Sequence, residues 1–222
     1  MRLALFDLDN TLLNGDSDYE WGQFLIQKGV LDKAVHEAKN QAFYDAYNAG
    51  NMNINEFLSY QLGNLAEHSR RKLKKWREEF LPKRILPLIT SQARSLLKSH
   101  DDDVKIIITA TNSFVTEPIA KELGINNLIA TEPQIKNGEF NGLVEGIPAF
   151  REGKVDRLKK WLRENEMIFS DFSETWFYSD SMNDLPLLSF VSHPVAVDPD
   201  PALEGYAIKH GWQIISLRTI NG

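Results

Sequence analysis

The chain has 222 residues, of which 42% are hydrophobic and 25% are charged, as is ordinary for a globular protein. Its net charge of −6 argues against a nucleic-acid partner, because such a partner requires basic surface that displaces phosphate counterions. Zero cysteines exclude disulfides, thiolate catalysis and cysteine zinc sites. No apolar run is long enough to cross a bilayer and strand-like sequence begins at once, so we expect a cytoplasmic protein without a membrane partner.

The first predicted element is a strand at residues 3–6, a continuous apolar run typical of a strand buried on both faces of a parallel sheet. It ends at Asp7 and Asp9, whose side chains point the same way if the backbone stays extended. Two crowded carboxylates resist joint ionisation unless a cation neutralises them or one keeps its proton. The pair therefore indicates a hard-metal site or a general acid, although a helix cap would also explain it.

Helical periodicity then covers about seventy residues, including an alanine stripe from Ala34 to Ala46. We interpret residues 14–82 as an α-helical cap inserted after the first strand, with residues 1–13 and 83–222 as the core domain. Three acids, Asp16, Asp18 and Glu20, stand where this insert begins. They either stabilise the first helical turn or face the cavity under the cap, where at least one would bind a cationic group of a substrate.

From residue 86 the chain alternates between strands and helices, which predicts an α/β fold with a doubly wound, mostly parallel sheet. Asn137-Gly138 is a strong hairpin signal inside residues 134–145, so a small β-ribbon is expected there. The other predicted strands are residues 105–109, 127–131, 175–179, 194–197 and 213–216. The predicted helices are residues 89–98, 114–123, 154–162 and 201–210.

Polar residues follow the predicted central strands at the points where these end. Beyond the first pair of acids they are Thr109, Asp180 and Asp184, and Lys154 stands at a helix start. Each residue alone has an ordinary structural explanation, such as a helix cap or a solvated lysine. Because parallel strands end at one edge of a sheet, the residues are expected to meet there in one site.

Four segments of the chain carry a resemblance to a known family. They are Asp-Leu-Asp-Asn-Thr (7–11), Ile-Ile-Ile-Thr (106–109), Glu-Gly-Lys-Val (152–155) and Tyr-Ser-Asp-Ser-Met-Asn-Asp (178–184). In this order they resemble the four motifs of the haloacid dehalogenase (HAD) superfamily. The helical insert and the ribbon are similar to its phosphoserine-phosphatase-like branch, which also includes phosphatases of histidinol phosphate. The resemblance implies a HAD-like Rossmannoid core with a cap.

The resemblance also implies a Mg²⁺-dependent phosphatase that works through an aspartyl-phosphate. Asp7 would be the nucleophile and Asp9 the general acid and base, while Lys154 and Thr109 would donate to the phosphoryl oxygens. The implied metal residues are Asp7, Asp9 through its carbonyl, Asp180 and Asp184. The implied substrate-binding residues are Asp16, Thr109, Ala110 and Asn183.

The substrate is expected to be a small phosphorylated metabolite that carries an amine or an imidazole. In phosphoserine phosphatases the second motif usually continues Ser-Gly-Gly, whereas this chain has Thr109-Ala110-Thr111, which favours histidinol phosphate over phosphoserine. A phosphomutase or phosphotransferase would use the same residues, and a non-catalytic module that binds a phosphorylated ligand is a further alternative. The expected assembly is a monomer or a homodimer.

Overall fold

The computed structural model describes residues 1–218, which form a seven-stranded sheet in the order β4-β3-β2-β1-β5-β6-β7. The central strand β1 (Arg2–Phe6) is parallel to β2 (Val104–Asn112) on one side and to β5 (Glu174–Ser179) on the other. The remaining strands are β3 (Asn127–Lys136), β4 (Glu139–Glu145), β6 (His193–Val197) and β7 (Gln213–Ile215). The pair β3 and β4 is antiparallel, and the other five described strand pairs are parallel. The predicted doubly wound, mostly parallel sheet is therefore confirmed.

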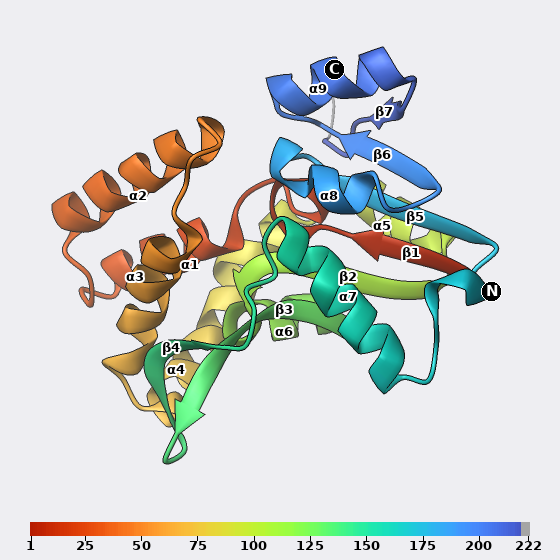
Figure 1. Ribbon diagram of the computed structural model, residues 1–222. Helices are drawn as coiled ribbons and strands as arrows, with labels where there is room; N and C mark the ends of the chain where they lie inside the picture. The colour runs from red at the N-terminus through yellow and green to blue at the C-terminus, as the bar shows by residue number, and fades with distance from the viewer. Residues whose placement is uncertain (219–222) are drawn as a thin grey trace.

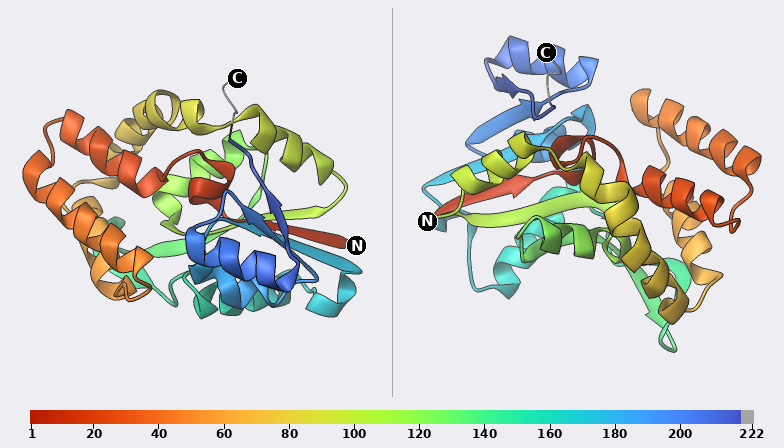
Figure 2. Two further views of the ribbon diagram at one scale, coloured as in Figure 1. Left: turned by 90° about the horizontal axis from the view of Figure 1, so that it is seen from above. Right: turned by 180° about the vertical axis from the view of Figure 1, so that it is seen from behind.

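Helices cover both faces of this sheet, which explains why the strands are apolar without alternation. In β1, Leu3 and Leu5 pack with the helices in front of the sheet in Figure 1, whereas Ala4 and Phe6 pack with the helices behind it. Figure 2 shows the helices behind the sheet, α5 (Ser91–Ser99) and α6 (Ser113–Glu122). The helices that pack with Leu3 and Leu5 are α7 (Glu152–Glu164), α8 (Leu185–Leu188) and α9 (Pro201–His210).

Between β1 and α5 the chain forms four helices, α1 to α4, and Figure 1 shows α1–α3 beyond the carboxyl ends of the parallel strands. Trp21, Leu62 and Phe80 from this insert pack into the same hydrophobic cluster as α5 and α6. Leu13 and Ile89 form an isolated β-bridge, so the segment that leads into the four helices and the segment that follows them lie side by side. The four helices are α1 (Ser17–Gln27), α2 (Lys33–Asn48), α3 (Ile54–Ala66) and α4 (Arg70–Phe80). The division into a core and a cap at residues 14–82 stays a prediction.

The predicted ribbon is a hairpin between β3 and β4, and α3 packs against β4. Asn137 and Gly138 both have positive φ, 53° and 84°, as a two-residue hairpin turn requires. The predicted end of the second strand at Thr109 was wrong, because β2 continues to Asn112. Its pairing with β3 is irregular between Ile108 and Asn112, where the Thr109 hydroxyl accepts a hydrogen bond from the backbone N–H of Thr111.

Shorter helical turns connect the main elements. Among the helices of residues 1–218, none combines the length and the apolar character needed to cross a membrane. The short turns are Leu8–Leu12, Leu81–Ile85, Leu86–Leu88, Phe169–Asp171 and Met182–Asp184.

Candidate active site

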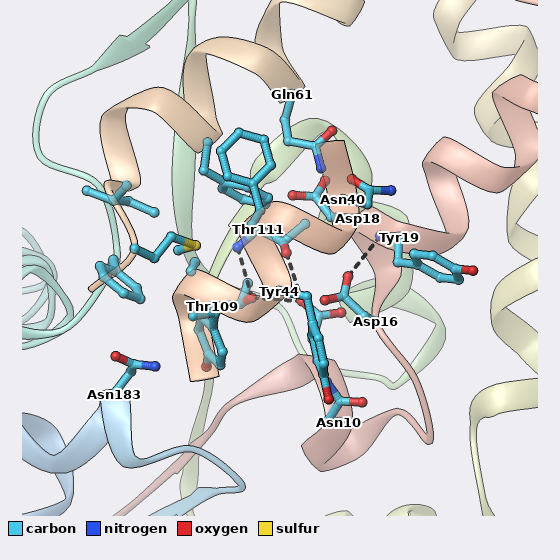
Figure 3. A pocket seen from close by; sticks show the side chains of 18 of the residues that line it. Asn10, Asp16, Asp18, Tyr19, Asn40, Tyr44, Gln61, Thr109, Thr111 and Asn183 are labelled. Carbon is cyan, nitrogen blue, oxygen red and sulfur yellow. Dashed lines mark hydrogen bonds between the residues drawn. The ribbon is translucent and has the colours of Figure 1, made fainter. Parts of the chain in front are cut away.

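One cavity of about 670 Å³ lies at the carboxyl edge of the sheet, and every residue predicted for the site lines it. The floor comes from the loops after β1 and β5, from the carboxyl end of β2 and from the start of α7, and the wall comes from α1, α2 and α3 (Figure 3). The predicted residues that line the cavity are Asp7, Asp9, Asp16, Thr109, Ala110, Lys154, Asp180, Asn183 and Asp184. The structure therefore brings together residues that are up to 177 positions apart in the sequence, from Asp7 to Asp184.

The loop after β1 positions Asp7. The backbone N–H of Asp7 donates to the Tyr178 carbonyl at 2.9 Å, which extends the pairing with β5 by one residue. The Thr11 hydroxyl lies 3.3 Å from Asp7 Oδ2 and 3.2 Å from Asp180 Oδ1, and it accepts a hydrogen bond from the backbone N–H of Asp180. Thr11 thus joins the two strand ends. This threonine belongs to the first motif, where no role was predicted for it.

Lys154 occupies the centre of the floor with 3% of its surface exposed. Its Nζ donates to Asp7 Oδ1 at 2.8 Å and to Asp184 Oδ2 at 2.6 Å. The Ser179 hydroxyl donates to the same Asp184 oxygen at 2.6 Å. Burial by itself would lower the pKa of Lys154, but the attraction of Asp184 and Asp7 outweighs burial and raises it. Lys154 is therefore a permanent cation between two acids.

The preceding residue, Gly153, lets the chain bring Lys154 to this place. A Cβ atom at position 153 would collide with the carbonyl oxygen of Pro148, so the close approach of the two backbones requires glycine. In the third motif, Gly153 is thus required for close backbone packing and Lys154 for its charge.

Negative charge exceeds positive charge on the floor. Burial raises the pKa of Asp7 to about 7, although Lys154 opposes the shift, and Asp184 adds to it. Burial, together with repulsion from Asp7 and Asp184, raises the pKa of Asp180 well above its usual range. Nothing in the described part of the chain groups three or more His, Cys, Asp or Glu side chains as a metal cage. A cation that takes only one or two carboxylates, as Mg²⁺ often does, would still relieve this repulsion.

Asp9 faces the cavity from the same loop, with its two oxygens in different surroundings. Oδ1 accepts from the backbone N–H of Ser17 at 2.6 Å, and Oδ2 accepts from the hydroxyls of Thr111 at 2.8 Å and Thr109 at 3.4 Å. Burial and repulsion from Asp16 raise the pKa of Asp9 to about 6. An acid with this pKa can both give and take a proton near neutral pH. Thr111 and Ser17 were not predicted as partners of Asp9, because Thr111 lies in the part of β2 beyond the predicted strand end and Ser17 begins α1, which reaches Asp9 only in the tertiary structure.

The three acids at the start of the insert have different environments. Asp16 accepts from the backbone N–H of Tyr19 at 2.9 Å and so caps α1, while it also lines the cavity. Asp18, on the first turn of α1, lines the cavity as well. Glu20 instead pairs with Arg84 at 3.2 Å and is not among the lining residues. Helix capping and exposure to the cavity are thus combined at Asp16.

Two contacts fasten the insert to the loops of the floor. Arg151, directly before α7, donates to the Gly50 carbonyl at 2.6 Å and to Asn183 Oδ1 at 2.9 Å. Its φ of 50° is unusual for a residue other than glycine, and such strain is often found at functional sites. The Tyr47 hydroxyl of α2 donates to Ser181 Oγ at 2.6 Å. Neither Arg151 nor Tyr47 was predicted, since no sequence motif marks a contact between an insert and a distant loop.

The cavity wall carries many aromatic side chains, and these were not predicted. The aromatic residues that line it are Tyr19, Phe43, Tyr44, Tyr47, Phe57 and Phe150. The polar residues on the helices of the wall include Glu37, Asn40, Gln41 and Gln61. A cavity with an acidic floor and an aromatic wall suits a ligand that has one charged end and one planar or apolar end.

Comparisons with known proteins agree with the four motifs. A family model described as haloacid dehalogenase-like hydrolase matches residues 4–189. Histidinol-phosphatase of Neisseria meningitidis serogroup C is 42% identical over 220 residues, which cover 98% of this chain and 99% of that protein. Phosphoserine phosphatase SerB1 of Mycobacterium tuberculosis is 30% identical and covers 97% of this chain, with 70% of its own length matched.

Solved structures share the fold. The crystal structure of a protein of unknown function from Bordetella pertussis Tohama I has a TM-score of 0.92 and 45% identity, over 98% of this chain and 99% of that one. A phospho-aspartyl intermediate analogue of phosphoserine phosphatase has a TM-score of 0.68 over 97% and 93% of the two chains, and at 22% identity it shows likeness of fold alone. The chain therefore belongs to the haloacid dehalogenase-like hydrolases, as its motifs predict, and its relatives place it with the phosphatases of that family.

Proposed function

We propose that the chain is a Mg²⁺-dependent phosphatase that hydrolyses histidinol phosphate through an aspartyl-phosphate on Asp7. The observation that carries the proposal is the arrangement of Asp7, Asp9 and Lys154 in one cavity, with Lys154 Nζ 2.8 Å from Asp7 Oδ1. The substrate is suggested by the histidinol-phosphatase of Neisseria meningitidis, which is 42% identical across nearly all of both chains. The missing Ser-Gly-Gly of the second motif supports histidinol phosphate over phosphoserine.

The first step would be attack of an Asp7 carboxylate oxygen on phosphorus, while the bond from phosphorus to the alkoxide oxygen breaks. Asp9 would give its proton to that leaving oxygen. In the second step Asp9 would take a proton from water, whose oxygen attacks phosphorus and releases phosphate and free Asp7. Lys154 and Thr109 would hold the phosphoryl oxygens, and this stabilisation matters most in the transition state.

The donor set fits Mg²⁺, which phosphatases of this family generally use. Asp7 and Asp180 offer carboxylate oxygens that the Thr11 hydroxyl already joins, and the backbone carbonyl of Asp9 would be a third ligand. Asp184 would act indirectly, since its Oδ2 accepts hydrogen bonds from Lys154 and Ser179. When bound, the ion would offset the charge of the phosphoryl group and of the carboxylates.

The insert would serve as a cap, with residues 14–82 forming a unit that covers the site. Its helices supply the wall of the cavity, and Arg151 and Tyr47 connect it to the loops that carry Asn183 and Ser181. Asp16, near Asp9, would be the acid that meets the amine of the substrate, and Ala110 and Asn183 would border the phosphate. Such closure keeps bulk water from the reacting groups.

The test is release of inorganic phosphate from histidinol phosphate, O-phosphoserine and an aryl phosphate, with Mg²⁺ and with a chelator. We expect kcat/KM for histidinol phosphate to exceed that for O-phosphoserine at least tenfold, a difference of about 1.4 kcal/mol. Activity should disappear with the chelator and return with Mg²⁺. Turnover that survives chelation would disprove the metal, and a preference for O-phosphoserine would disprove the substrate.

A further inference from the structure

Asp18 lies on the cavity wall with one carboxylate oxygen unused. The residue is 4% exposed and lines the cavity from the first turn of α1. Its Oδ1 accepts a hydrogen bond from Asn112 Nδ2 at 3.2 Å, whereas its Oδ2 is buried and has no partner among the described residues. Figure 3 shows Asp18 together with Asn40 and Gln61, away from Asn183.

An unpartnered buried carboxylate is costly, so its presence requires a reason. A buried polar atom without a partner costs about 1–3 kcal/mol, and more if it is charged. Burial and the nearby Asp16 and Asp9 raise the pKa of Asp18 well above its usual range. Capping of α1 does not explain the residue, because Asp16 already makes that hydrogen bond. A ligand that enters the cavity is what remains to satisfy Oδ2.

The surroundings of Asp18 indicate the chemistry of that ligand. Among the cavity-lining residues of the described chain, Lys154 is the one lysine or arginine, and its ammonium is already shared by Asp7 and Asp184. The described lining therefore supplies no free cation to Asp18 Oδ2, and a donor on the ligand can satisfy this oxygen. The Nδ2 atom of Asn40 is also buried and has no partner in the part of the chain that the structure describes.

The shape and polarity of the wall favour a planar ring with two polar edges. Phe43, Tyr44 and Phe57 line the cavity and offer faces on which a ring can stack. An imidazole can donate one N–H to Asp18, and its other nitrogen can meet the amide of Asn40. That amide can present either its oxygen or its nitrogen, so it suits both the neutral and the protonated ring.

We propose that Asp18, assisted by Asn40, is the residue that selects the imidazole ring of the substrate. The proposal rests on the proposed function, because it assigns a partner to one half of histidinol phosphate. The acids at the start of α1 then have separate tasks: Asp16 meets the amine near the phosphate, and Asp18 meets the ring further along the wall.

The experiment compares kcat/KM for histidinol phosphate and leucinol phosphate, which share the phosphate and the amine and differ in the side chain. The selectivity ratio is kcat/KM for histidinol phosphate divided by kcat/KM for leucinol phosphate. An effect of a substitution that alters both values equally leaves this ratio unchanged. In Asp18→Asn, the oxygen of the new amide stays opposite Asn112, so an N–H donor takes the place of Oδ2. We expect the ratio to fall at least about tenfold, the size of one lost hydrogen bond to a charged group.

Glu20→Gln is the matched control, because it removes a carboxylate from the same helix outside the cavity. Its selectivity ratio should equal that of the wild type. Asn40→Ala, on α2, provides a second variant and should lower the ratio by a smaller factor. An Asp18→Asn variant that melts at or above the wild-type temperature would show that a fall in its ratio is not caused by misfolding.

Failure of this inference and failure of the proposed function give different results. If the wild type prefers histidinol phosphate and Asp18→Asn keeps that preference, the role of Asp18 is overturned while the proposed function stands. If the wild type does not hydrolyse histidinol phosphate, or shows no preference over leucinol phosphate, the proposed substrate is wrong and the assignment of Asp18 is overturned with it.

Discussion

The floor and the wall of the cavity satisfy their polar groups differently. On the floor, both oxygens of Asp7 have partners, in Lys154 and Thr11, and Asp184 also binds Lys154. On the wall, Asp18 Oδ2 and Asn40 Nδ2 are buried and have no hydrogen-bond partner within residues 1–218. The floor is preorganised for a group that is the same in every phosphomonoester, as catalysis of phosphoryl transfer requires. The wall is completed only when a particular ligand arrives, and so it can discriminate between ligands.

The most severe test of the floor is Asp7→Asn. The amide is nearly isosteric with the carboxylate but cannot attack phosphorus, so kcat should fall by at least about 10⁴-fold. Phosphate release from histidinol phosphate and from an aryl phosphate measures the loss, and circular dichroism shows whether the fold is kept. Near-wild-type turnover in a folded Asp7→Asn variant would refute the assignment of the nucleophile.

Asp9→Asn separates the two steps of the proposed reaction. Loss of general acid and base catalysis should lower kcat by about 10²–10⁴-fold. The loss should be smaller for an aryl phosphate, whose leaving group needs less protonation, and the slow attack by water should then let aspartyl-phosphate accumulate. Acid quenching and mass spectrometry of the intact chain detect the added phosphoryl group. Equal losses for alkyl and aryl phosphates, without accumulation, would argue against a role of Asp9 as the acid.

The metal site should tolerate change better than the nucleophile. Asp180→Asn removes one carboxylate from a hard-cation site, so the Mg²⁺ concentration for half-activity should rise by at least the about 10–100-fold that is typical when a residue that only supports a metal ligand is lost. Asp184→Asn should raise it less, because Asp184 Oδ2 is already bound to Lys154 and Ser179. Titration of activity with Mg²⁺ measures both shifts. A larger shift in Asp184→Asn than in Asp180→Asn would reverse their proposed roles.

The floor was largely predictable because its residues stand where strands end. Asp7, Thr109 and Asp180 follow apolar runs, and the carboxyl ends of parallel strands share one edge of the sheet. What the sequence did not show was the detailed course of the loops. Asn10, with a φ of 56°, turns the chain so that Thr11 reaches both strand ends, and such a turn has no apolar pattern to mark it.

The wall was much less predictable, although its helices were foreseen. Within α2, the alanine stripe indicated a helix, yet Ala34, Ala38 and Ala42 are exposed, while Asn40 and Tyr44 line the cavity. Periodicity identifies a helix and its apolar face, but the packing of that helix decides what faces a distant loop. The contact of Arg151 with Gly50 depends on tertiary structure in the same way.

The smallest expected effect concerns the stability of the wall without ligand or metal. Because the pKa of Asp18 is raised by folding, the folded state binds more protons than the unfolded state in the range above pH 3.8. The contribution of Asp18 to the free energy of unfolding is thus complete below that pH and is lost as pH rises toward its folded pKa. Asp18→Asn should therefore be more stable than the wild type at pH 7, by about 1 kcal/mol, the lower end of the cost of an unpartnered buried group. The gain should shrink toward pH 4, where Asp18 is protonated in the folded wild type.

Urea unfolding at both pH values, in chelator and with Glu20→Gln as control, measures this difference. If Asp18→Asn were less stable than the wild type at pH 7, the carboxylate of Asp18 would stabilise the fold, and its unpartnered oxygen would not indicate a ligand site.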